Sequence, residues 1–365
     1  MPTAIVRRTA SQLFMVGIPG PELDAPTRRF LAEHPPGGVI LFRRNVRSAA
    51  QLRDLVAALH SLGAGARTLV GIDHEGGRVD RLPRPFTHFP PMATVGETGD
   101  PRLAEAVGLA MGRELRAVGI DVDFAPVLDV WSNPRNTVIG DRAFGTTPAQ
   151  VARLALAFAR GLRRGGVVAC GKHFPGHGAT TGDSHFVLPR SNRTRRELER
   201  IDLAPFARAA RAGIPALMTA HVVCPALDRR PATLSRAVAH DLLRRRLGFR
   251  GVLFSDDLDM QAMAGRRRIG RTAVGALQAG CDMLLVCQAL DSTRAAIAGV
   301  ETALARGTLD PRAVAASLAR IEALRRSVDQ RRAPAGRFGW PAHERLARRL
   351  AGRPDVRATA KRATG

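Results

Sequence analysis

The segment Val-Val-Ala-Cys-Gly-Lys-His-Phe, at residues 167–174, is an apolar run that ends in a lysine, a histidine and a phenylalanine. Its nearly continuous hydrophobicity is typical of a strand buried on both faces of a parallel sheet. Seven further apolar runs share this character, at residues 13–18, 38–42, 68–73, 122–126, 216–222, 252–257 and 283–287. Helical patterns lie between them, for example at 103–117, 150–164, 195–212 and 236–247. Eight strand–helix units predict a single-domain α/β fold, a TIM-like (β/α)8 barrel, with an open doubly wound sheet as the alternative.

The composition of the 365-residue chain changes near residue 330. We expect residues 1–330 to form the barrel. Residues 331–365 are strongly basic, are interrupted by prolines and have a helical pattern only at 343–350. This pattern predicts a short docked helix followed by a basic C-terminal tail.

The chain carries 56 basic and 32 acidic residues, a formal net charge of +24, and its only lysines are Lys172 and Lys361. Such an excess is compatible with a nucleic-acid-binding protein. However, aromatic residues make up only 4% of the chain and tyrosine is absent, so the basic segments lack the stacking platforms of single-strand binders. We therefore interpret the arginines as solvated helix faces and expect no nucleic-acid partner.

The cysteines and the hydropathy of the chain indicate its cellular compartment. The four cysteines form no CxxC pair, which predicts reduced, buried thiols in a cytosolic protein: Cys170, Cys224, Cys281 and Cys287. The apolar stretch 13–16 is stopped by Gly17 and is too short for an export signal. No apolar run approaches the ~18 residues that span a membrane. We expect a cytoplasmic protein with no membrane partner.

Four of the predicted strands end in ionisable residues. The clusters are Asp73-His74-Glu75, Lys172-His173, Thr219-Ala220-His221 and Ser255-Asp256-Asp257. Barrel enzymes carry their chemistry at the C-terminal ends of the strands, so these clusters predict an active site at that rim.

The densest group of chemically active residues follows residues 167–174. Pro175 and nearby glycines mark a loop that contains His177, Asp183 and His185. Three interpretations compete. Asp183 and His185 could form a dyad in which the carboxylate polarises a general acid/base; these residues, with His173 and His177, could bind a metal; or they could be ordinary polar loop residues.

A second group surrounds Asp256, a carboxylate at the tip of a buried strand and placed to attack or to stabilise positive charge. Because adjacent strand residues point to opposite faces, only one of Asp256 and Asp257 can face the barrel mouth. We expect one catalytic and one structural aspartate. Two weaker groups are the glycine- and arginine-rich stretch 71–81 and a turn-rich stretch that could present Arg142 to the same rim.

Together these motifs resemble glycoside hydrolase family 3, and within it the single-domain bacterial β-N-acetylglucosaminidases of peptidoglycan recycling. The resemblance covers roughly residues 10–330 and rests on six segments in order, at 71–81, 124–130, 139–144, 172–185, 220–222 and 255–258. His74 is a departure, because a glutamine is usual at this position.

The resemblance implies a retaining mechanism without a metal or another cofactor. Asp256 would be the nucleophile, His185 the general acid/base and Asp183 the residue that polarises it. The sugar hydroxyls would be held by a set of five residues: Asp73, Arg81, Arg142, Lys172 and His173.

The implied reaction is exo-acting removal of terminal β-linked GlcNAc from a carbohydrate substrate, GlcNAc-anhydro-muropeptides, in the cytoplasm. Phosphorolysis at the same site and β-glucosidase activity are the alternatives within the family.

Overall fold

The structure, a computed structural model, describes residues 4–62, 67–180, 188–260, 268–329 and 340–352. Eight parallel strands form one sheet in the order β7-β6-β5-β4-β3-β2-β1-β8. They are β1 (Phe14–Gly17), β2 (Gly38–Leu41), β3 (Leu69–Ile72), β4 (Val122–Asp123), β5 (Val168–Phe174), β6 (Ala216–Thr219), β7 (Val252–Phe254) and β8 (Leu284–Val286). Each of the eight predicted apolar runs contains one of them.

The two edge strands of this sheet meet each other. A parallel bridge joins Phe254 to Met283, and the N–H of Ser255 donates to the carbonyl of Met283 at 2.9 Å. The sheet therefore closes into a barrel, which confirms the predicted (β/α)8 fold over the open doubly wound sheet.

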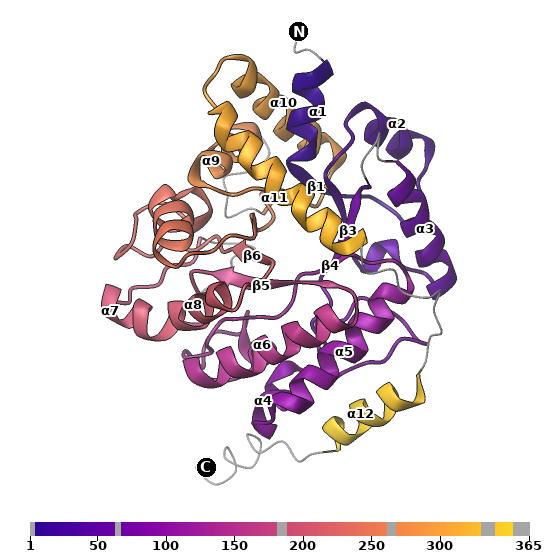
Figure 1. Ribbon diagram of the computed structural model, residues 1–365, viewed down its shortest axis with the longest axis vertical. Helices are drawn as coiled ribbons and strands as arrows, with labels where there is room; N and C mark the ends of the chain where they lie inside the picture. Colours follow the sequence, from indigo (N-terminus) through magenta and orange to yellow (C-terminus); the bar gives the residue numbers. More distant parts are fainter. Residues whose placement is uncertain (1–3, 63–66, 181–187, 261–267, 330–339, 353–365) are drawn as a thin grey trace.

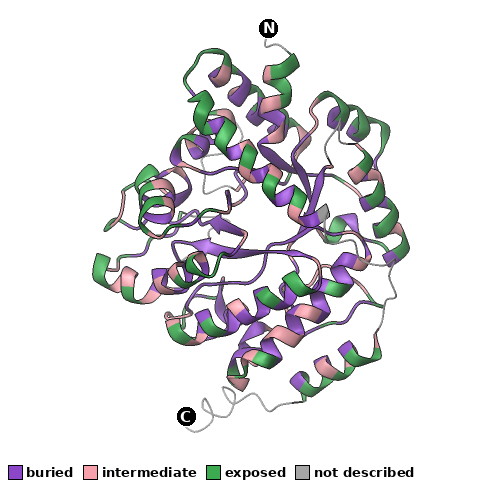
Figure 2. Ribbon diagram, in the orientation of Figure 1, coloured by how far each residue is buried: buried purple, intermediate pink, exposed green. Residues whose placement is uncertain are grey.

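Helices surround the barrel and turn their buried faces towards it (Figures 1 and 2). The α-helices are α1 (Ala4–Gln12), α2 (Ala25–Glu33), α3 (Ala49–Ser61), α4 (Met92–Thr98), α5 (Pro101–Ala117), α6 (Pro148–Arg164), α7 (Arg195–Glu197), α8 (Leu203–Arg211), α9 (Ile269–Ala279), α10 (Leu290–Ala305), α11 (Pro311–Asp329) and α12 (Pro341–Ala351). Short 3-10 segments are η1 (Arg43–Asn45), η2 (Gly140–Arg142) and η4 (Ala232–Leu234), while η3 (Leu198–Asp202) and η5 (Ala237–Arg246) are π-helical.

The four predicted helical patterns correspond to α5, α6, the α7–η3–α8 segment and η5. The last two differ from simple α-helices, because each contains a π-helical stretch. Apolar periodicity predicts that a segment is helical but does not resolve the change from i→i+4 to i→i+5 bonding.

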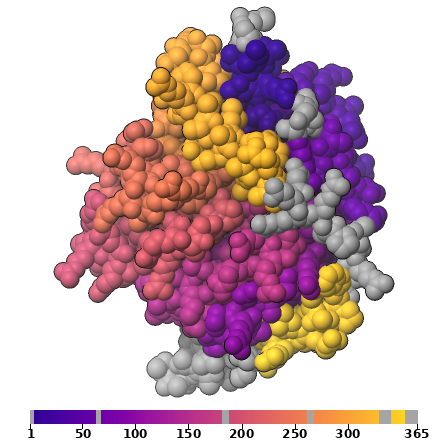
Figure 3. Space-filling view, in the orientation of Figure 1, coloured from indigo at the N-terminus to yellow at the C-terminus, as the bar shows by residue number. Residues whose placement is uncertain are grey.

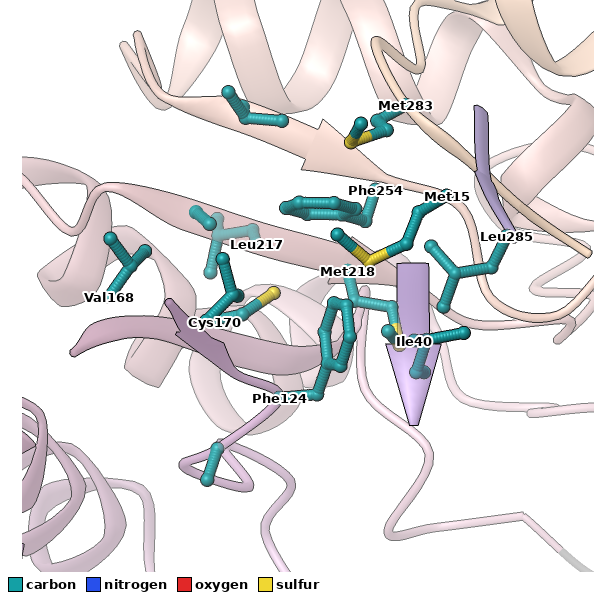
Figure 4. Close-up of a cluster of buried hydrophobic side chains, with 14 of the residues drawn as sticks. Met15, Ile40, Phe124, Val168, Cys170, Leu217, Met218, Phe254, Met283 and Leu285 are labelled. Atoms are coloured by element: carbon teal, nitrogen blue, oxygen red, sulfur yellow. The ribbon is translucent and has the colours of Figure 1, made fainter. Parts of the chain in front are cut away.

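Large apolar side chains fill the inside of the barrel (Figure 4). The rings of Phe124 and Phe254 pack edge to face, with centroids 5.2 Å apart, and both side chains are fully buried beside Met15. Inward-facing side chains pack here while their neighbours contact the helices, which explains why the strand sequences are apolar without alternation. The core ends, towards the C-terminal ends of the strands, at Ile40, Met218 and Leu285, which also line a cavity.

Helix α11 lies across the N-terminal ends of the strands and runs diagonally through the upper half of the face seen in Figures 1 and 3. Ser317 Oγ donates to Asp282 at 2.8 Å, and Arg320 Nη2 donates to the same carboxylate at 2.8 Å. Further along the helix, Arg325 Nη2 donates to Gln12 Oε1 at 3.1 Å. This end of the barrel is therefore closed by protein.

Helix α12, at the position of the predicted C-terminal helix, docks on α4 and α5. Leu350 and Ala347 are buried, and His343 Nδ1 lies 2.7 Å from Glu114 Oε1. The tail predicted after it lies outside the described residues. Among the described residues, no helix is long and apolar enough to cross a membrane.

Candidate active site

A cavity of about 220 Å³ opens at the C-terminal end of the barrel. Its floor is the apolar top of the barrel core, and its walls combine charged and polar side chains with apolar ones such as Phe42 and Ile139. The polar lining residues include Asp73, Glu75, Arg81, Arg142, Lys172, His173, His177, Asp256, Asp257 and Gln288. Six of the eight predicted site residues, all those within the described part of the chain, thus meet in one cavity.

Lys172, at the end of β5, is the centre of an ion-pair cluster. Its Nζ donates to Asp73 Oδ1 at 2.5 Å and lies 2.6 Å from Glu75 Oε1. Glu75 also holds Arg142 in a bidentate pair, with both nitrogen–oxygen distances at 2.8 Å. These four side chains come from the β3 loop, η2 and β5, so the barrel geometry brings distant segments together.

The charges in this cluster stabilise one another. Burial alone would lower the pKa of Lys172, but the carboxylates of Asp73 and Glu75 outweigh burial and raise it. Burial would raise the pKa of Glu75, but Arg142 and Lys172 outweigh this effect and hold it far below its usual range. Lys172 is therefore an ammonium, and Glu75 a carboxylate, at neutral pH.

Asp129, which follows β4, organises the end of β5. Its Oδ2 accepts from His173 Nδ1 at 2.7 Å and from the His173 backbone N–H at 3.2 Å. Its Oδ1 accepts the His177 backbone N–H at 2.7 Å. Because Nδ1 of His173 donates to Asp129, the other ring nitrogen, Nε2, is left for the cavity.

His177 lies on the turn after β5 and is 2% exposed. Its Nδ1 lies 2.8 Å from Thr180 Oγ1, and its carbonyl accepts from Asn136 Nδ2 at 2.7 Å. A side chain at Gly178 would clash with the carbonyl of Val130, 1.9 Å from the Cβ position, so only glycine allows this close approach. Burial lowers the pKa of His177, despite the opposing effect of Asp129. We infer a neutral imidazole.

Asp256 follows β7 and is partly exposed to the cavity. Its Oδ1 accepts the backbone N–H of Asp257 at 2.8 Å. Burial alone would raise the pKa of Asp256, but the imidazoles of His221 and His173 beside it outweigh burial and lower it. An ionised carboxylate therefore faces the cavity, as a nucleophile requires.

Asp257 has a structural role instead. Its Oδ1 accepts the backbone N–H groups of Asp259 and Cys287, both at 3.0 Å. Its own carbonyl oxygen lies 2.9 Å from Nε2 of the fully buried His221. Burial raises the pKa of Asp257 to about 6. Asp257 thus ties the end of β7 to that of β8, as expected of the structural aspartate. Both aspartates line the cavity, contrary to the expectation that only one would face it, and the catalytic role of Asp256 stays a prediction.

Arg81 lies at the edge of the cavity, and its Nε is buried without a hydrogen-bond partner among the described residues. The departure at His74 lies beside it: the Arg81 backbone N–H donates to His74 Nδ1 at 3.4 Å. Burial lowers the pKa of His74, so the imidazole is neutral and can accept this bond. His74 supports the loop and does not line the cavity.

The predicted dyad, Asp183 and His185, lies outside the described residues, so its geometry stays a prediction. The same holds for the metal interpretation, which included both residues. Within the described part of the chain, no group of three or more His, Cys, Asp or Glu side chains is placed to hold a metal ion. All four cysteines are free and buried, as predicted.

Two residues to which the sequence analysis gave no individual role have several contacts in the site. Glu75 stands in a strand-end cluster and Asp129 in the segment 124–130, so both were visible as motif members. Their function depends on cross-barrel partners, which strand patterns do not predict.

Known proteins are similar to this chain in sequence. Residues 5–324 match the glycosyl hydrolase family 3 N terminal domain. A beta-hexosaminidase from Chromobacterium violaceum is 47% identical over 293 residues, which cover 78% of this chain and 81% of the relative. A beta-hexosaminidase from Methylococcus capsulatus is 45% identical, covering 79% of this chain and 86% of that protein.

Solved structures are also similar. A family 3 β-N-acetylglucosaminidase from Paenibacillus superposes with a TM-score of 0.90 at 39% identity, over 94% of this chain and 68% of that one. NagZ from Neisseria gonorrhoeae, solved in complex with N-trifluoroacetyl-D-glucosamine, superposes with a TM-score of 0.79 at 37% identity, over 93% of this chain and 98% of that one.

Proposed function

Since the chain belongs to glycosyl hydrolase family 3, we propose that it is an exo-acting, retaining β-N-acetylglucosaminidase. Its substrates would be peptidoglycan fragments of the GlcNAc-anhydro-muropeptide type, from which it removes the terminal β-linked GlcNAc in the cytoplasm. The chain shares its enzyme class, glycoside hydrolases acting on β-N-acetylhexosaminides, with the curated relatives. The observation that carries the mechanism is the position of Asp256, whose carboxyl group lines the same cavity as the paired charges of Lys172, Glu75 and Arg142.

In this mechanism Asp256 attacks the anomeric carbon while His185 gives its proton to the leaving oxygen. A covalent glycosyl–enzyme forms, and the aglycone departs as an alcohol. His185 then takes a proton from water, whose oxygen attacks the same carbon and releases GlcNAc with retained configuration. Asp183 polarises His185 in both steps.

The described residues fit the sugar-binding part of this proposal. Asp73 offers carboxylate oxygens to sugar hydroxyls, while Lys172, Arg142 and Arg81 offer N–H donors. The bound N-trifluoroacetyl-D-glucosamine in the Neisseria gonorrhoeae structure supports an N-acylated glucosamine as the ligand. Four free, buried cysteines are consistent with a reducing compartment.

One set of assays tests the activity. Aryl β-GlcNAc and aryl β-glucoside are compared as substrates, each with and without phosphate, and the sugar products are identified. We expect aryl β-GlcNAc to be preferred and free GlcNAc to be the product under both conditions. GlcNAc-1-phosphate as the main product would replace hydrolysis by phosphorolysis, and a preference for the glucoside would indicate a β-glucosidase.

The retaining mechanism needs its own test. A slowly hydrolysed fluorinated GlcNAc donor should leave one sugar residue covalently attached, and peptide mass spectrometry should locate it on Asp256. A product of inverted configuration, followed by NMR at early times, would contradict the glycosyl–enzyme.

A further inference from the structure

Glu75 is the least exposed charged residue of the Lys172 cluster, and nothing in the proposed mechanism uses it. Its side chain is 2% exposed, against 18% for Asp73. It is among the residues that line the cavity, where it contacts two cations, Lys172 and Arg142. A carboxylate so enclosed has little surface left for a sugar.

The contacts of Glu75 restrict both cations at once. Arg142 gives Nε–H and one N–H of Nη2 to the two oxygens of Glu75, and Nη1 donates to the carbonyl of Val138 at 3.1 Å. A bidentate pair of this type sets the plane of the guanidinium as well as its position. Of the five N–H groups of Arg142, one on Nη1 and one on Nη2 have no partner among the described residues.

Lys172 is restrained in the same way. Two carboxylates, Asp73 and Glu75, take the ammonium from two directions, at 2.5 and 2.6 Å. An ammonium has three N–H groups, so one is left for a ligand. Without Glu75, Lys172 would keep a single anchor on the more exposed Asp73 and would regain rotamer freedom.

We propose that Glu75 is a positioning residue, which aims the free N–H groups of Lys172 and Arg142 at the hydroxyls of the bound sugar. This inference rests on the proposed function and goes beyond it, because it assigns the orientation of two sugar-binding cations to one buried carboxylate. Glu75 acts through these cations and does not itself touch the sugar.

The Glu75→Gln substitution tests this assignment with little change of shape. Glutamine keeps one acceptor oxygen and replaces the other by an NH2 donor, which cannot accept from Arg142, so the bidentate pair with Arg142 is lost and the charge that holds Lys172 is removed. We expect the inhibition constant for free GlcNAc and the KM for aryl β-GlcNAc to rise at least about tenfold, and kcat/KM to fall about 100-fold, the scale of an approximately 1 Å misplacement.

These readouts separate positioning from a general loss of structure. A partly unfolded preparation loses apparent kcat, but the inhibition constant and KM of its folded fraction stay those of the wild type. The matched control is Asp282→Asn, a buried carboxylate that Arg320 and Arg244 hold at the closed end of the barrel. It should lower the melting temperature and leave both constants unchanged.

A double-mutant cycle tests whether Glu75 acts through its partners. In an Arg142→Ala background, Glu75→Gln should cost distinctly less than in the wild type, because one of its two targets is gone. If Glu75→Gln does not fold, Glu75→Asp, which keeps the charge but shortens the side chain, should still raise the inhibition constant.

Wild-type constants in folded Glu75 variants, or fully additive losses in the cycle, would overturn the inference. Failure of the proposed function is a different outcome, because wild-type protein would then turn over no aryl β-GlcNAc.

Discussion

The two ends of the barrel both carry buried carboxylates, but they use them differently. At the N-terminal end, Asp121 accepts from Arg67 and Arg116 with one oxygen and from the Val70 backbone N–H with the other. Both oxygens of Asp282 likewise accept hydrogen bonds, from two arginines, a serine and a backbone N–H. Both side chains are fully buried.

At the C-terminal end, protein partners leave hydrogen-bonding capacity for a ligand. Asp256 is partly exposed, and Lys172 and Arg142 keep N–H groups that have no partner within the described part of the chain. The two ends therefore differ in how many protein partners each carboxylate has. Carboxylates whose oxygens are all paired with protein groups hold the barrel together, whereas those with free capacity are available to a ligand. In barrel enzymes this division follows the direction of the strands.

Asp256→Ala should give the largest effect. Removing the nucleophile should lower kcat by at least about 10⁴-fold, because the covalent step is lost. The melting temperature should stay close to that of the wild type, since among the described residues this carboxylate accepts one hydrogen bond, from the backbone N–H of Asp257. Added azide should restore turnover of an aryl glycoside and give a glycosyl azide of inverted configuration. Full activity of the variant would refute the assignment.

Asp129→Asn tests a carboxylate that shares features of both ends of the barrel. Asp129 is fully buried, as Asp121 and Asp282 are, yet it holds His173, which lines the cavity. The asparagine cannot accept from both backbone N–H groups and from His173 Nδ1 as the carboxylate does. We expect kcat/KM to fall about 10- to 100-fold and the melting temperature to fall as well. A loss of stability with unchanged kcat/KM would mean that Asp129 has a purely structural role, like Asp121 and Asp282.

Asp282→Asn should lose stability and keep activity. Removing one partner of a buried ion pair leaves the arginines uncompensated, and we expect the free energy of unfolding to fall by about 3 kcal/mol. Denaturant unfolding measures this change, and active-site titration gives turnover per folded molecule. A changed turnover number would show that the closed end communicates with the cavity.

For Asp202, at the end of η3, we predict a smaller effect, on how the stability of the protein changes with pH. Burial raises the pKa of its carboxyl to about 7, although Arg193 opposes the rise. Because the folded state then binds the proton more tightly than the unfolded state, Asp202 makes stability fall as pH rises from about 4 to about 7. Asp202→Asn should therefore lose less stability than the wild type over this range. Parallel curves of unfolding free energy against pH would contradict it.

Removal of divalent metal ions by a chelator should change neither the activity nor the stability of the protein. The proposed mechanism uses side chains alone, so EDTA treatment followed by dialysis should leave kcat/KM and the melting temperature unchanged. A loss of activity that zinc restores would revive the metal interpretation, in which His173, His177, Asp183 and His185 are the ligands.

The sequence alone predicted the barrel and several residues that line the cavity, because both have local signatures. Near-continuous apolar runs between helical segments require a sheet covered on both sides, and the ionisable residues at the ends of these runs require a polar rim. Asp256, Lys172 and Asp73 were therefore predictable from their positions at strand ends. The relationship between Asp183 and His185 stays a sequence-based prediction.

Tertiary structure alone decided which charges pair. Glu75 and Arg142 are 67 residues apart in the chain, and Lys172 and Asp73 are 99 apart. Periodicity reports which face of an element is buried, but it carries no information on which distant side chain meets that face. Closure of the barrel sets those meetings, and through them the ionisation of Glu75, the structural role of Asp257 and the enclosure of Asp282 beneath α11.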